Sequence, residues 1–333
     1  MTDQAGSDSE TDEESELLEG LEKALLGGKR RYTRLEVAEK AGVDIDRAVR
    51  LWRALGFASV ADSQKVFGNS DVEALEQIAA LVENGVVSQD VEASLARALG
   101  QTMARLADWQ TTVLRDNAFE DGSGLPDQKV ILTAAKHLIP VLEQLQSYIW
   151  RRHLIAAAGR LLPVSAEDSD SSTLVAGFAD IVGFTSLSRT VEDSELAELI
   201  DHFEGTSSGI IAEHGGRVVK MIGDEVLFVV ETPTQGADIA LALTAWVEND
   251  EDFPKLRIGL AHGTVLSRLG DVYGPIVNVA SRLTSLARPG STLVDRDLAM
   301  ALKEEPDYSV RKLRRVSVRG YSHLEPWALH SSV

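Results

Sequence analysis

The chain has 333 residues, no cysteine, and 33 basic against 52 acidic residues, which gives a formal charge of −19. Disulfides and thiolate metal sites are therefore excluded, and the net charge provides no long-range attraction to nucleic acid or anionic lipid. No stretch approaches the roughly 20 apolar residues of a membrane span, and the acidic N-terminus is unlike a signal peptide, so a cytoplasmic protein is expected.

The first half of the chain is predicted to be helical. Its first twenty residues carry eight acidic side chains and no Lys or Arg, so residues 1–16 are expected to form a disordered acidic tail. Apolar residues then recur every three or four positions between glycines, which predicts an all-helical domain over residues 17–128. The helices predicted within it are 17–26, 33–41, 45–55, 71–83 and 88–115.

One further long helix is predicted at 129–162, after an acidic connector at 116–128. The polar stretch 165–172 follows it and is interpreted as a linker. Residues 129–172 would thus join the helical domain to a second domain at 173–333.

The spacing of apolar residues in the second domain differs from that in the helical half. β-prone runs alternate with helical patterns, which predicts an α+β domain with a sheet covered by helices on one face. The predicted strands are 173–179, 217–222, 226–231, 256–262, 291–295, 309–318 and 325–330. The predicted helices are 193–214, 234–248, 275–288 and 295–303.

A first candidate site lies where the strand 173–179 ends at Asp180. Gly183, Phe184 and Thr185 then lead toward a helix, and a loop of this kind offers backbone N–H groups to a phosphate. A carboxylate beside a phosphate would repel it unless a cation lies between them, which points to Mg²⁺ or Mn²⁺. Taken alone, an Asp after a strand is more often a cap or turn residue.

A second carboxylate, Asp224, lies in the turn Ile-Gly-Asp-Glu between two β-prone runs, a hairpin signal. It too is more often a plain turn residue when taken alone. If the hairpin lies beside the first strand, both carboxylates reach the same cation, as in two-metal phosphoryl chemistry.

Three segments occur in order: FADIVGFTSLS, GGRVVKMIGDEVLFVV and GDVYGPIVNVASRL. Together they resemble the class III adenylate/guanylate cyclase catalytic domain. The resemblance covers about residues 170–330 and implies a ferredoxin-like fold with a mostly antiparallel sheet. It also implies that Asp180, Asp224 and the Ile181 carbonyl hold two Mg²⁺ or Mn²⁺ ions per site.

The same resemblance assigns roles to further residues. Lys220 and Asp271 match the pair that selects the purine, and a Lys with an Asp implies ATP. Asn278 and Arg282, four apart on a helix, match the residues that orient the ribose and stabilise charge on the phosphates in the transition state. Arg319 matches a late residue that contacts the triphosphate. Ser291 stands where some relatives carry a phosphate-contacting Arg, which leaves part of that contact set open.

The activity implied is conversion of ATP to 3′,5′-cyclic AMP and pyrophosphate. In this family the metal residues and the base-selecting residues of one site come from two catalytic domains. A chain with one such domain is therefore expected to form a head-to-tail homodimer with composite sites.

The helical half of the chain also resembles known protein domains. Residues 31–78 look like a MerR-type helix-turn-helix with several arginines, so DNA binding is an alternative. The whole half resembles the regulatory domain of pH-responsive mycobacterial-type adenylate cyclases, which is the preferred interpretation, with no nucleic acid expected. The N-terminal domains would then dimerise, and the helix 129–162 would transmit a signal. His137 and His153 lie in it and could titrate near neutral pH.

Three rival functions remain at this stage. A diguanylate cyclase is suggested by Ile-Gly-Asp-Glu-Val, which resembles Gly-Gly-Asp-Glu-Phe, but the helix of Asn278 and Arg282 has no place there. A guanylate cyclase would need other residues at 220 and 271. A catalytically silent helix-turn-helix DNA-binding or signalling protein is the third, although all six principal positions are present.

Overall fold

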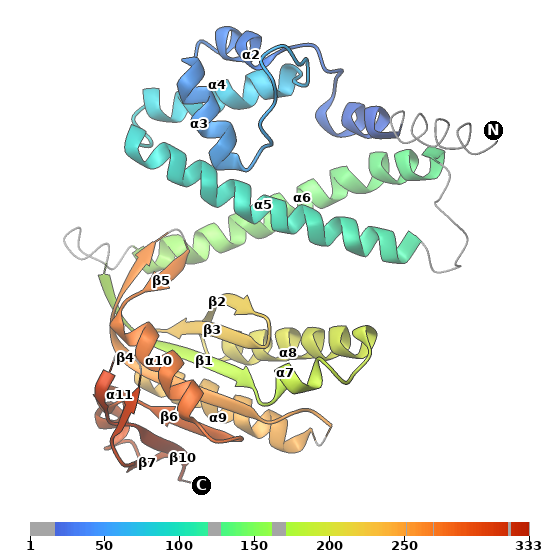
Figure 1. Ribbon diagram of the computed structural model, residues 1–333. Coiled ribbons are helices and arrows are strands. Elements are labelled where there is room, and N and C mark those ends of the chain that lie inside the picture. Colours follow the sequence, from blue (N-terminus) through green and yellow to red (C-terminus); the bar gives the residue numbers. More distant parts are fainter. Residues whose placement is uncertain are drawn as a thin grey trace. The chain divides into compact units, whose positions relative to one another are not determined.

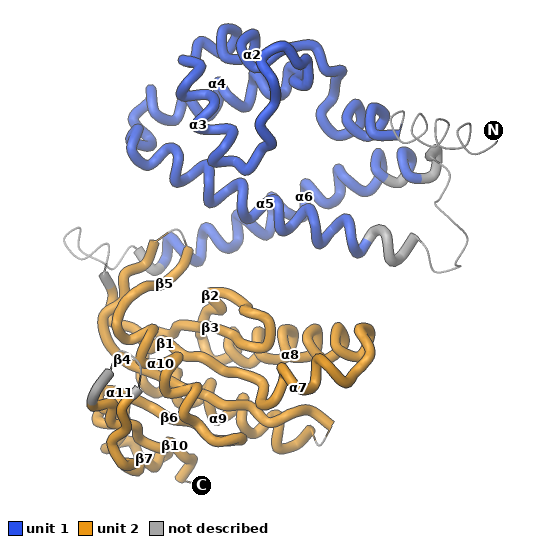
Figure 2. Tube along the Cα trace, in the orientation of Figure 1, with its two compact units in different colours: residues 1–162 blue, residues 163–333 orange. Residues whose placement is uncertain are grey.

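A computed structural model describes residues 17–118, 128–161, 171–250, 252–268, 270–318 and 321–332. The chain divides into two compact units, residues 1–162 and 163–333 (Figure 2). Each unit has a hydrophobic core of its own. Within the described ranges, no helix combines the length and the apolar character that crossing a bilayer requires.

The first unit is helical, as expected (Figure 1). Its helix starts follow from capping chemistry: Thr33 forms a reciprocal capping box with Glu36, and Asp44 accepts the N–H groups of Asp46 and Arg47. Gly56 ends a helix in the left-handed conformation, with φ 85°. After a helical segment at 17–26, the helices are α2 (Arg34–Lys40), α3 (Ile45–Leu55), α4 (Asn69–Glu83), α5 (Gln89–Ala118) and α6 (Gln128–Leu161).

The core of this unit joins α3 to its neighbours. Leu51 and Trp52 of α3 are buried together with Leu75 of α4 and Ala96 of α5. A half-buried ion pair adds to this packing, because the Arg47 Nε donates to the carboxylate of the buried Glu92 at 3.1 Å. This pair links α3 to α5.

The second unit is built on one sheet of eight strands, in the order β2-β3-β1-β4-β6-β10-β7, with β5 paired to β4. Every pairing is antiparallel except β4 with β6, so the expected mostly antiparallel α+β fold is confirmed. The strands are β1 (Ser171–Ile181), β2 (Arg217–Ile222), β3 (Glu225–Val230), β4 (Leu256–Arg268), β5 (Asp271–Tyr273), β6 (Ser291–Val294), β7 (Tyr308–Lys312) and β10 (Trp327–Ser331); β8 (Val316–Val318) and β9 (Tyr321–Leu324) form a separate hairpin.

Helices cover both faces of this sheet, which corrects the expectation of a single covered face. Val175 and Ala179 of β1 pack in the core that includes α8, α9 and α11, whereas Ala176 and Phe178 pack with Ala280 of α10 on the opposite face. The helices are α7 (Phe184–Leu187), α8 (Asp193–Glu213), α9 (Pro233–Asn249), α10 (Pro275–Leu286) and α11 (Arg296–Leu302).

Element ends differ from the predictions where side-chain periodicity is weak. The predicted strand 309–318 is two strands, β7 and β8, and β4 extends to Arg268 rather than ending at 262. The short β5 and α7 have three and four residues, too few for a period to be recognised.

Close packing on the α10 face depends on a glycine. A Cβ at Gly259 of β4 would overlap the Thr284 nitrogen and the Ala280 carbonyl oxygen of α10. We expect Gly259→Ala to lower the free energy of unfolding by about 2–3 kcal/mol, because backbone atoms cannot move aside as a flexible side chain can. Urea denaturation of the full chain measures this loss.

Gly205→Ala is the matched control for this substitution. Gly205 lies on the exposed side of α8, where an added Cβ has nothing within 4 Å. Because alanine favours a helix over glycine, this variant should gain about 0.5–1 kcal/mol. Equal stability of the two variants would contradict the close approach of α10 to β4.

Candidate active site

Asp180 lies near the end of β1, within a row of charged residues across three strands. Its register partners are Glu225 on β3 and Arg257 on β4. Directly paired residues of neighbouring strands share a face, and this face is the one that carries Phe178 and α10. The Arg257 Nε donates to Asp180 Oδ2 at 2.9 Å. Across β3, β1 and β4, the row therefore consists of two acidic residues followed by one basic residue.

The turn of the β2–β3 hairpin brings Asp224 to the same strand end. Gly223 supplies the left-handed conformation of this turn, with φ 65°. The Ile181 N–H donates to the Asp224 carbonyl at 3.0 Å, which fixes the turn against β1. The structure thus brings together the three residues predicted to hold metal ions, Asp180, Ile181 and Asp224.

The carboxyl groups of Asp180, Asp224 and Glu225 lie close enough together to shift pKa values. Burial raises the pKa of Asp180 above its usual range, Arg257 opposes this, and the charge of Asp224 adds to it. Burial, together with the charges of Asp180 and Asp224, raises the pKa of Glu225 to about 7. The negative charge of these carboxyl groups exceeds the positive charge of Arg257, and a divalent cation would relieve that excess. Within the described residues, no three acidic or His side chains converge as ligands of one metal ion.

The loop after β1 carries the three residues predicted to contact phosphate. Gly183 adopts a left-handed conformation with φ 78° and precedes the single turn α7. Phe184 packs against the sheet core, while Gly183 and Thr185 are exposed. Phe184 and Thr185 open the helical turn, so their N–H groups have no partner within it. The Val182 N–H donates to the Lys255 carbonyl at 2.9 Å and ties this loop to the start of β4.

Lys220 and Asp271 meet although they are 51 positions apart in the sequence. The Lys220 Nζ donates to Asp271 Oδ2 at 2.6 Å, and Asp271 Oδ1 accepts the Val272 N–H at 2.8 Å. Burial acts to raise the pKa of Asp271, but these two hydrogen bonds lower it below its usual value overall. The Arg217 side chain also reaches the Gly270 carbonyl, at 3.4 Å, so β2 holds the β4–β5 hairpin at two points.

Asn278 and Arg282 lie on the outer side of α10. The helix buries Ala280, Leu283 and Thr284, whereas Asn278 is exposed and Arg282 half-buried. At 3.6 residues per turn, Asn278 and Arg282 lie roughly 160° and 200° around the helix from Ala280. Both side chains therefore project away from the sheet that carries Asp180. Arg319, the last predicted contact, lies outside the described residues.

Sequence reasoning missed Arg257 and Glu225. Glu225 follows Asp224 directly in the sequence, but no role was assigned to it. Arg257 is the second residue of β4, 77 positions after Asp180, and only the β1–β4 register reveals their pairing.

Two family descriptions match this chain. The adenylate and guanylate cyclase catalytic domain matches residues 164–331, and the adenylate cyclase regulatory domain matches residues 10–155. An adenylate cyclase of Streptomyces coelicolor is 40% identical over 94% of this chain and 88% of its own length. One of Streptomyces griseus is 42% identical over 85% of this chain and 71% of its own length. A pH-sensitive adenylate cyclase of Mycobacterium tuberculosis is 31% identical over 82% of this chain and 70% of its own length.

Proposed function

Because this chain belongs to the class III adenylate and guanylate cyclases and is an adenylate cyclase, we propose that it converts ATP to 3′,5′-cyclic AMP and pyrophosphate at composite sites of a homodimer. The observation that carries the proposal is the joint presence of the Asp180–Asp224 cluster, the Lys220–Asp271 pair, and an outward-facing Asn278 and Arg282. Each group fits a different part of a nucleoside triphosphate.

Cyclase domains of this family generally use divalent metal ions. Asp180, Asp224 and the Ile181 carbonyl would hold Mg²⁺ or Mn²⁺, two per site, since these oxygen ligands are the ones such ions prefer. The excess negative charge around Asp180 and Glu225 supports this assignment. When bound, two such cations would lower the pKa of the ribose 3′-hydroxyl and neutralise charge on the leaving pyrophosphate. Gly183, Phe184 and Thr185 would donate backbone N–H groups to the phosphates.

The orientation of α10 supports composite sites. Asn278 and Arg282 face away from their own sheet, which favours contact with the phosphates bound at Asp180 of another molecule. Two apolar register partners on the β4–β5 hairpin, Leu266 and Tyr273, are 45% and 50% exposed, as expected of a surface that a partner covers. In the composite site, Asn278 would orient the ribose and Arg282 would stabilise charge on the phosphates. Arg319 would add a contact to the triphosphate.

The Lys220–Asp271 pair supports ATP as the substrate. Lys220 would donate to a ring nitrogen of adenine, and Asp271 would accept from its exocyclic amine. Guanine presents a protonated ring nitrogen to Lys220 and a carbonyl oxygen to Asp271. A donor would then face a donor and an acceptor would face an acceptor, so both hydrogen bonds would be lost. The ion pair holds both groups in place before the base arrives, which limits the ordering cost of binding.

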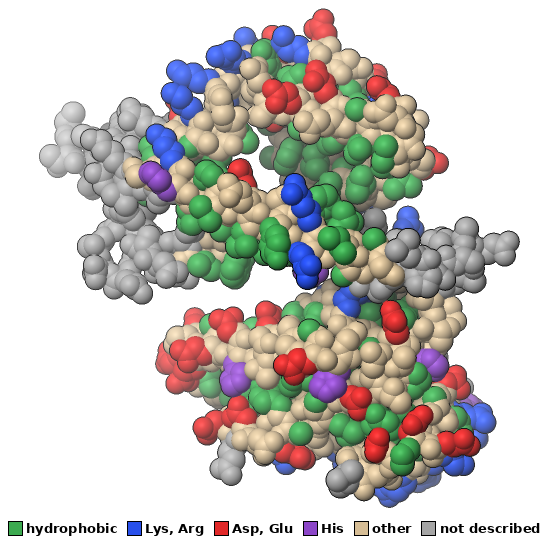
Figure 3. All heavy atoms as spheres, turned by 180° about the vertical axis from the view of Figure 1, so that it is seen from behind, with side chains coloured by type: hydrophobic (Ala, Val, Ile, Leu, Met, Phe, Trp, Pro, Cys, Tyr) green, Lys and Arg blue, Asp and Glu red, His purple; other side chains and the backbone are tan. Residues whose placement is uncertain are grey.

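The helical unit supports dimerisation through the N-terminal half as well. In the view of Figure 3, exposed hydrophobic side chains gather over the long helices of this unit. Trp109 of α5 is 63% exposed, and Tyr148, Trp150 and Ile155 of α6 are 61%, 60% and 67% exposed. Large apolar side chains in such number mark an interaction surface. We assign it to the same helices of a second chain.

Regulation by pH is the finer part of the proposal. Its support is the likeness to the pH-sensitive cyclase of Mycobacterium tuberculosis and the presence of His137 and His153 on α6. The His137 Nδ1 lies 2.8 Å from the Thr133 carbonyl one turn earlier, so the ring contacts the helix backbone. α6 would carry a change in the charge of this ring toward the catalytic unit.

Product identification tests the function. Purified chain incubated with Mn²⁺ and ATP should form cyclic AMP and pyrophosphate, with GTP turned over at least about 100-fold more slowly. Repeating the assay between pH 5.5 and 8 tests the regulation, because a His-linked switch should change the rate near its titration range. Formation of a cyclic dinucleotide, or of cyclic GMP as fast as cyclic AMP, would refute the substrate, and no product with either nucleotide would refute the activity.

A further inference from the structure

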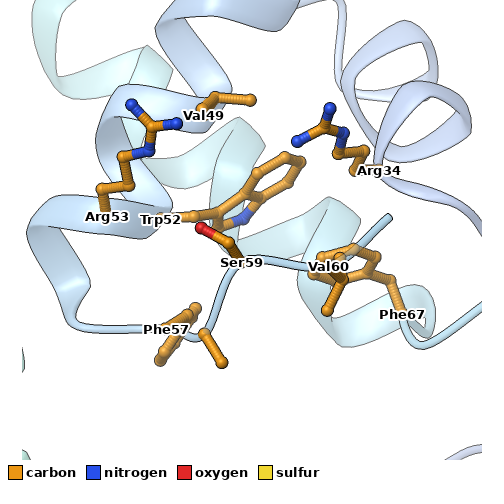
Figure 4. Close-up of a pocket in the computed structure, with 9 residues that line it drawn as sticks. Arg34, Val49, Trp52, Arg53, Phe57, Ser59, Val60 and Phe67 are labelled. Carbon is orange, nitrogen blue, oxygen red and sulfur yellow. The ribbon is translucent and has the colours of Figure 1, made fainter. Parts of the chain in front are cut away.

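Aromatic side chains anchor an irregular segment of the chain in each unit. In the helical unit, Trp52 stacks on Phe67, with ring centroids 5.0 Å apart (Figure 4), and Phe67 ends the segment 57–67. In the second unit, a larger aromatic cluster surrounds Phe253, which precedes β4. This cluster is close along the chain to the candidate active site, because Arg257, the partner of Asp180, follows Phe253 by four positions.

Rings from two helices enclose Phe253, which is only 7% exposed. Its ring centroid lies 4.7 Å from that of Trp246 on α9, 6.4 Å from that of Phe203 on α8, and 5.6 Å from that of His202, also on α8. These separations lie within the roughly 4.5–7 Å over which aromatic rings attract each other. Phe253 is therefore held from both helices just before the chain enters β4.

The chain between this anchor and the active-site loop is short and stiff. Pro254 follows Phe253 directly, and its ring fixes the backbone angle φ. The next carbonyl, that of Lys255, accepts the Val182 N–H at 2.9 Å. A displacement of the Phe253 ring would therefore displace the acceptor of the Val182 N–H.

The Val182 N–H belongs to the same peptide group as the Ile181 carbonyl, one of the predicted metal ligands. A peptide group is planar, and the described residues contain no cis peptide bond, so the N–H and the carbonyl of this group point in opposite directions. The hydrogen bond to Lys255 therefore fixes the direction of the Ile181 carbonyl. The Ile181 N–H is held as well, by the Asp224 carbonyl at 3.0 Å, so both peptide groups of this residue are fixed.

We propose that Phe253 is a positioning residue for the metal site. Its ring holds the Lys255 carbonyl, which through the Val182 N–H aims the Ile181 carbonyl at a divalent cation. The proposal rests on the assignment of Ile181 as a metal ligand in the proposed function. A side chain that only packs the core would affect stability and the fraction of folded enzyme, whereas a positioning side chain also affects how tightly the cation is held.

Hydrogen exchange of the Val182 amide tests this link without any measurement of activity. NMR of the full chain labelled with ¹⁵N-valine follows the exchange, and Val182→Ile identifies the signal. We expect the amide to exchange about tenfold faster in Phe253→Leu than in the wild type, because the hydrogen bond to Lys255 would open more often. Phe253→Tyr keeps the ring and should restore most of the protection. Trp246→Leu removes the ring nearest to Phe253 and should act in the same direction, which keeps the test decisive if Phe253→Leu does not fold.

The Mn²⁺ requirement of the reaction tests the consequence. Phe253→Leu should raise the Mn²⁺ concentration for half-maximal cyclic AMP formation about tenfold, while excess Mn²⁺ restores at least about half of the wild-type kcat. An enzyme that is only less stable would lose maximal rate and keep its Mn²⁺ requirement. The matched control is Leu302→Ala, which truncates a buried side chain of the same core on α11 and should change neither the Mn²⁺ requirement nor the exchange of the Val182 amide.

Several results would overturn the proposal. Wild-type exchange of the Val182 amide in both Phe253→Leu and Trp246→Leu would show that the ring does not hold the Lys255 carbonyl. Faster exchange with an unchanged Mn²⁺ requirement would show that the Ile181 carbonyl is not aimed in this way, and an equal effect of Leu302→Ala would reduce the role of Phe253 to packing. A wild-type chain without cyclase activity would refute the proposed function, whereas the exchange measurement would still decide whether Phe253 holds Val182.

Discussion

Mixing an inactive Asp180→Ala chain with an inactive Arg282→Ala chain is expected to restore about one quarter of the wild-type activity. Random pairing of equal amounts makes half of the dimers mixed, and each mixed dimer has one intact site of two. Each variant alone should lose at least about 100-fold in kcat, because one lacks a metal ligand and the other the cation that stabilises the phosphates. Cyclic AMP formation, measured after co-incubation of the purified chains, gives the result.

The structural reason lies in the opposite placement of the two residues. Asp180 belongs to the sheet, and Arg282 lies on the side of α10 that faces away from it. The matched control mixes Asp180→Ala with Asp224→Ala. Both substitutions damage the same half of a site, so every mixed dimer still has two defective sites and no activity should return. Recovery in this control, or none in the first mixture, would contradict shared sites.

The second large effect is expected at the pair that selects the base. Lys220→Glu combined with Asp271→Cys should lower kcat/KM for ATP at least about 100-fold and raise turnover of GTP. The reason is that the hydrogen-bond donor and acceptor would be exchanged for groups that fit guanine, while mismatched polar groups penalise adenine. Steady-state rates with both nucleotides measure the ratio.

Arg217→Gln is the matched control for this switch. Arg217 lies on the same strand as Lys220 and binds the Gly270 carbonyl of the same hairpin, so its loss disturbs the support of the pair but not its polarity. We expect an unchanged preference for ATP over GTP. If the double variant keeps the wild-type preference, or if the control loses it, then the Lys220–Asp271 pair does not read the base.

The elements of the fold were predictable to different extents. Helices such as α3 were predicted with their ends, because Asp44 and Gly56 signal the start and the stop in the local sequence. The strand predicted over 309–318 was wrong at its centre, since residues 313–315, Leu-Arg-Arg, contain no glycine or proline that would signal a break between two strands. The covering of the second sheet face by α10 was also missed, because amphipathic spacing does not tell which face a helix covers.

The sequence by itself determined the kinds of residue that the chemistry needs: carboxylates at a strand end and in a hairpin turn, a Lys with an Asp, and an Asn and an Arg four apart on a helix. These follow from local order, which a sequence carries directly. Only the tertiary structure decided which groups meet. Strand register places Arg257 and Glu225 beside Asp180, and the reach of the β4–β5 hairpin joins Asp271 to Lys220. The packing of α10 on Gly259 turns Asn278 and Arg282 outward, because the close contact of backbone atoms allows α10 to bury only its opposite side.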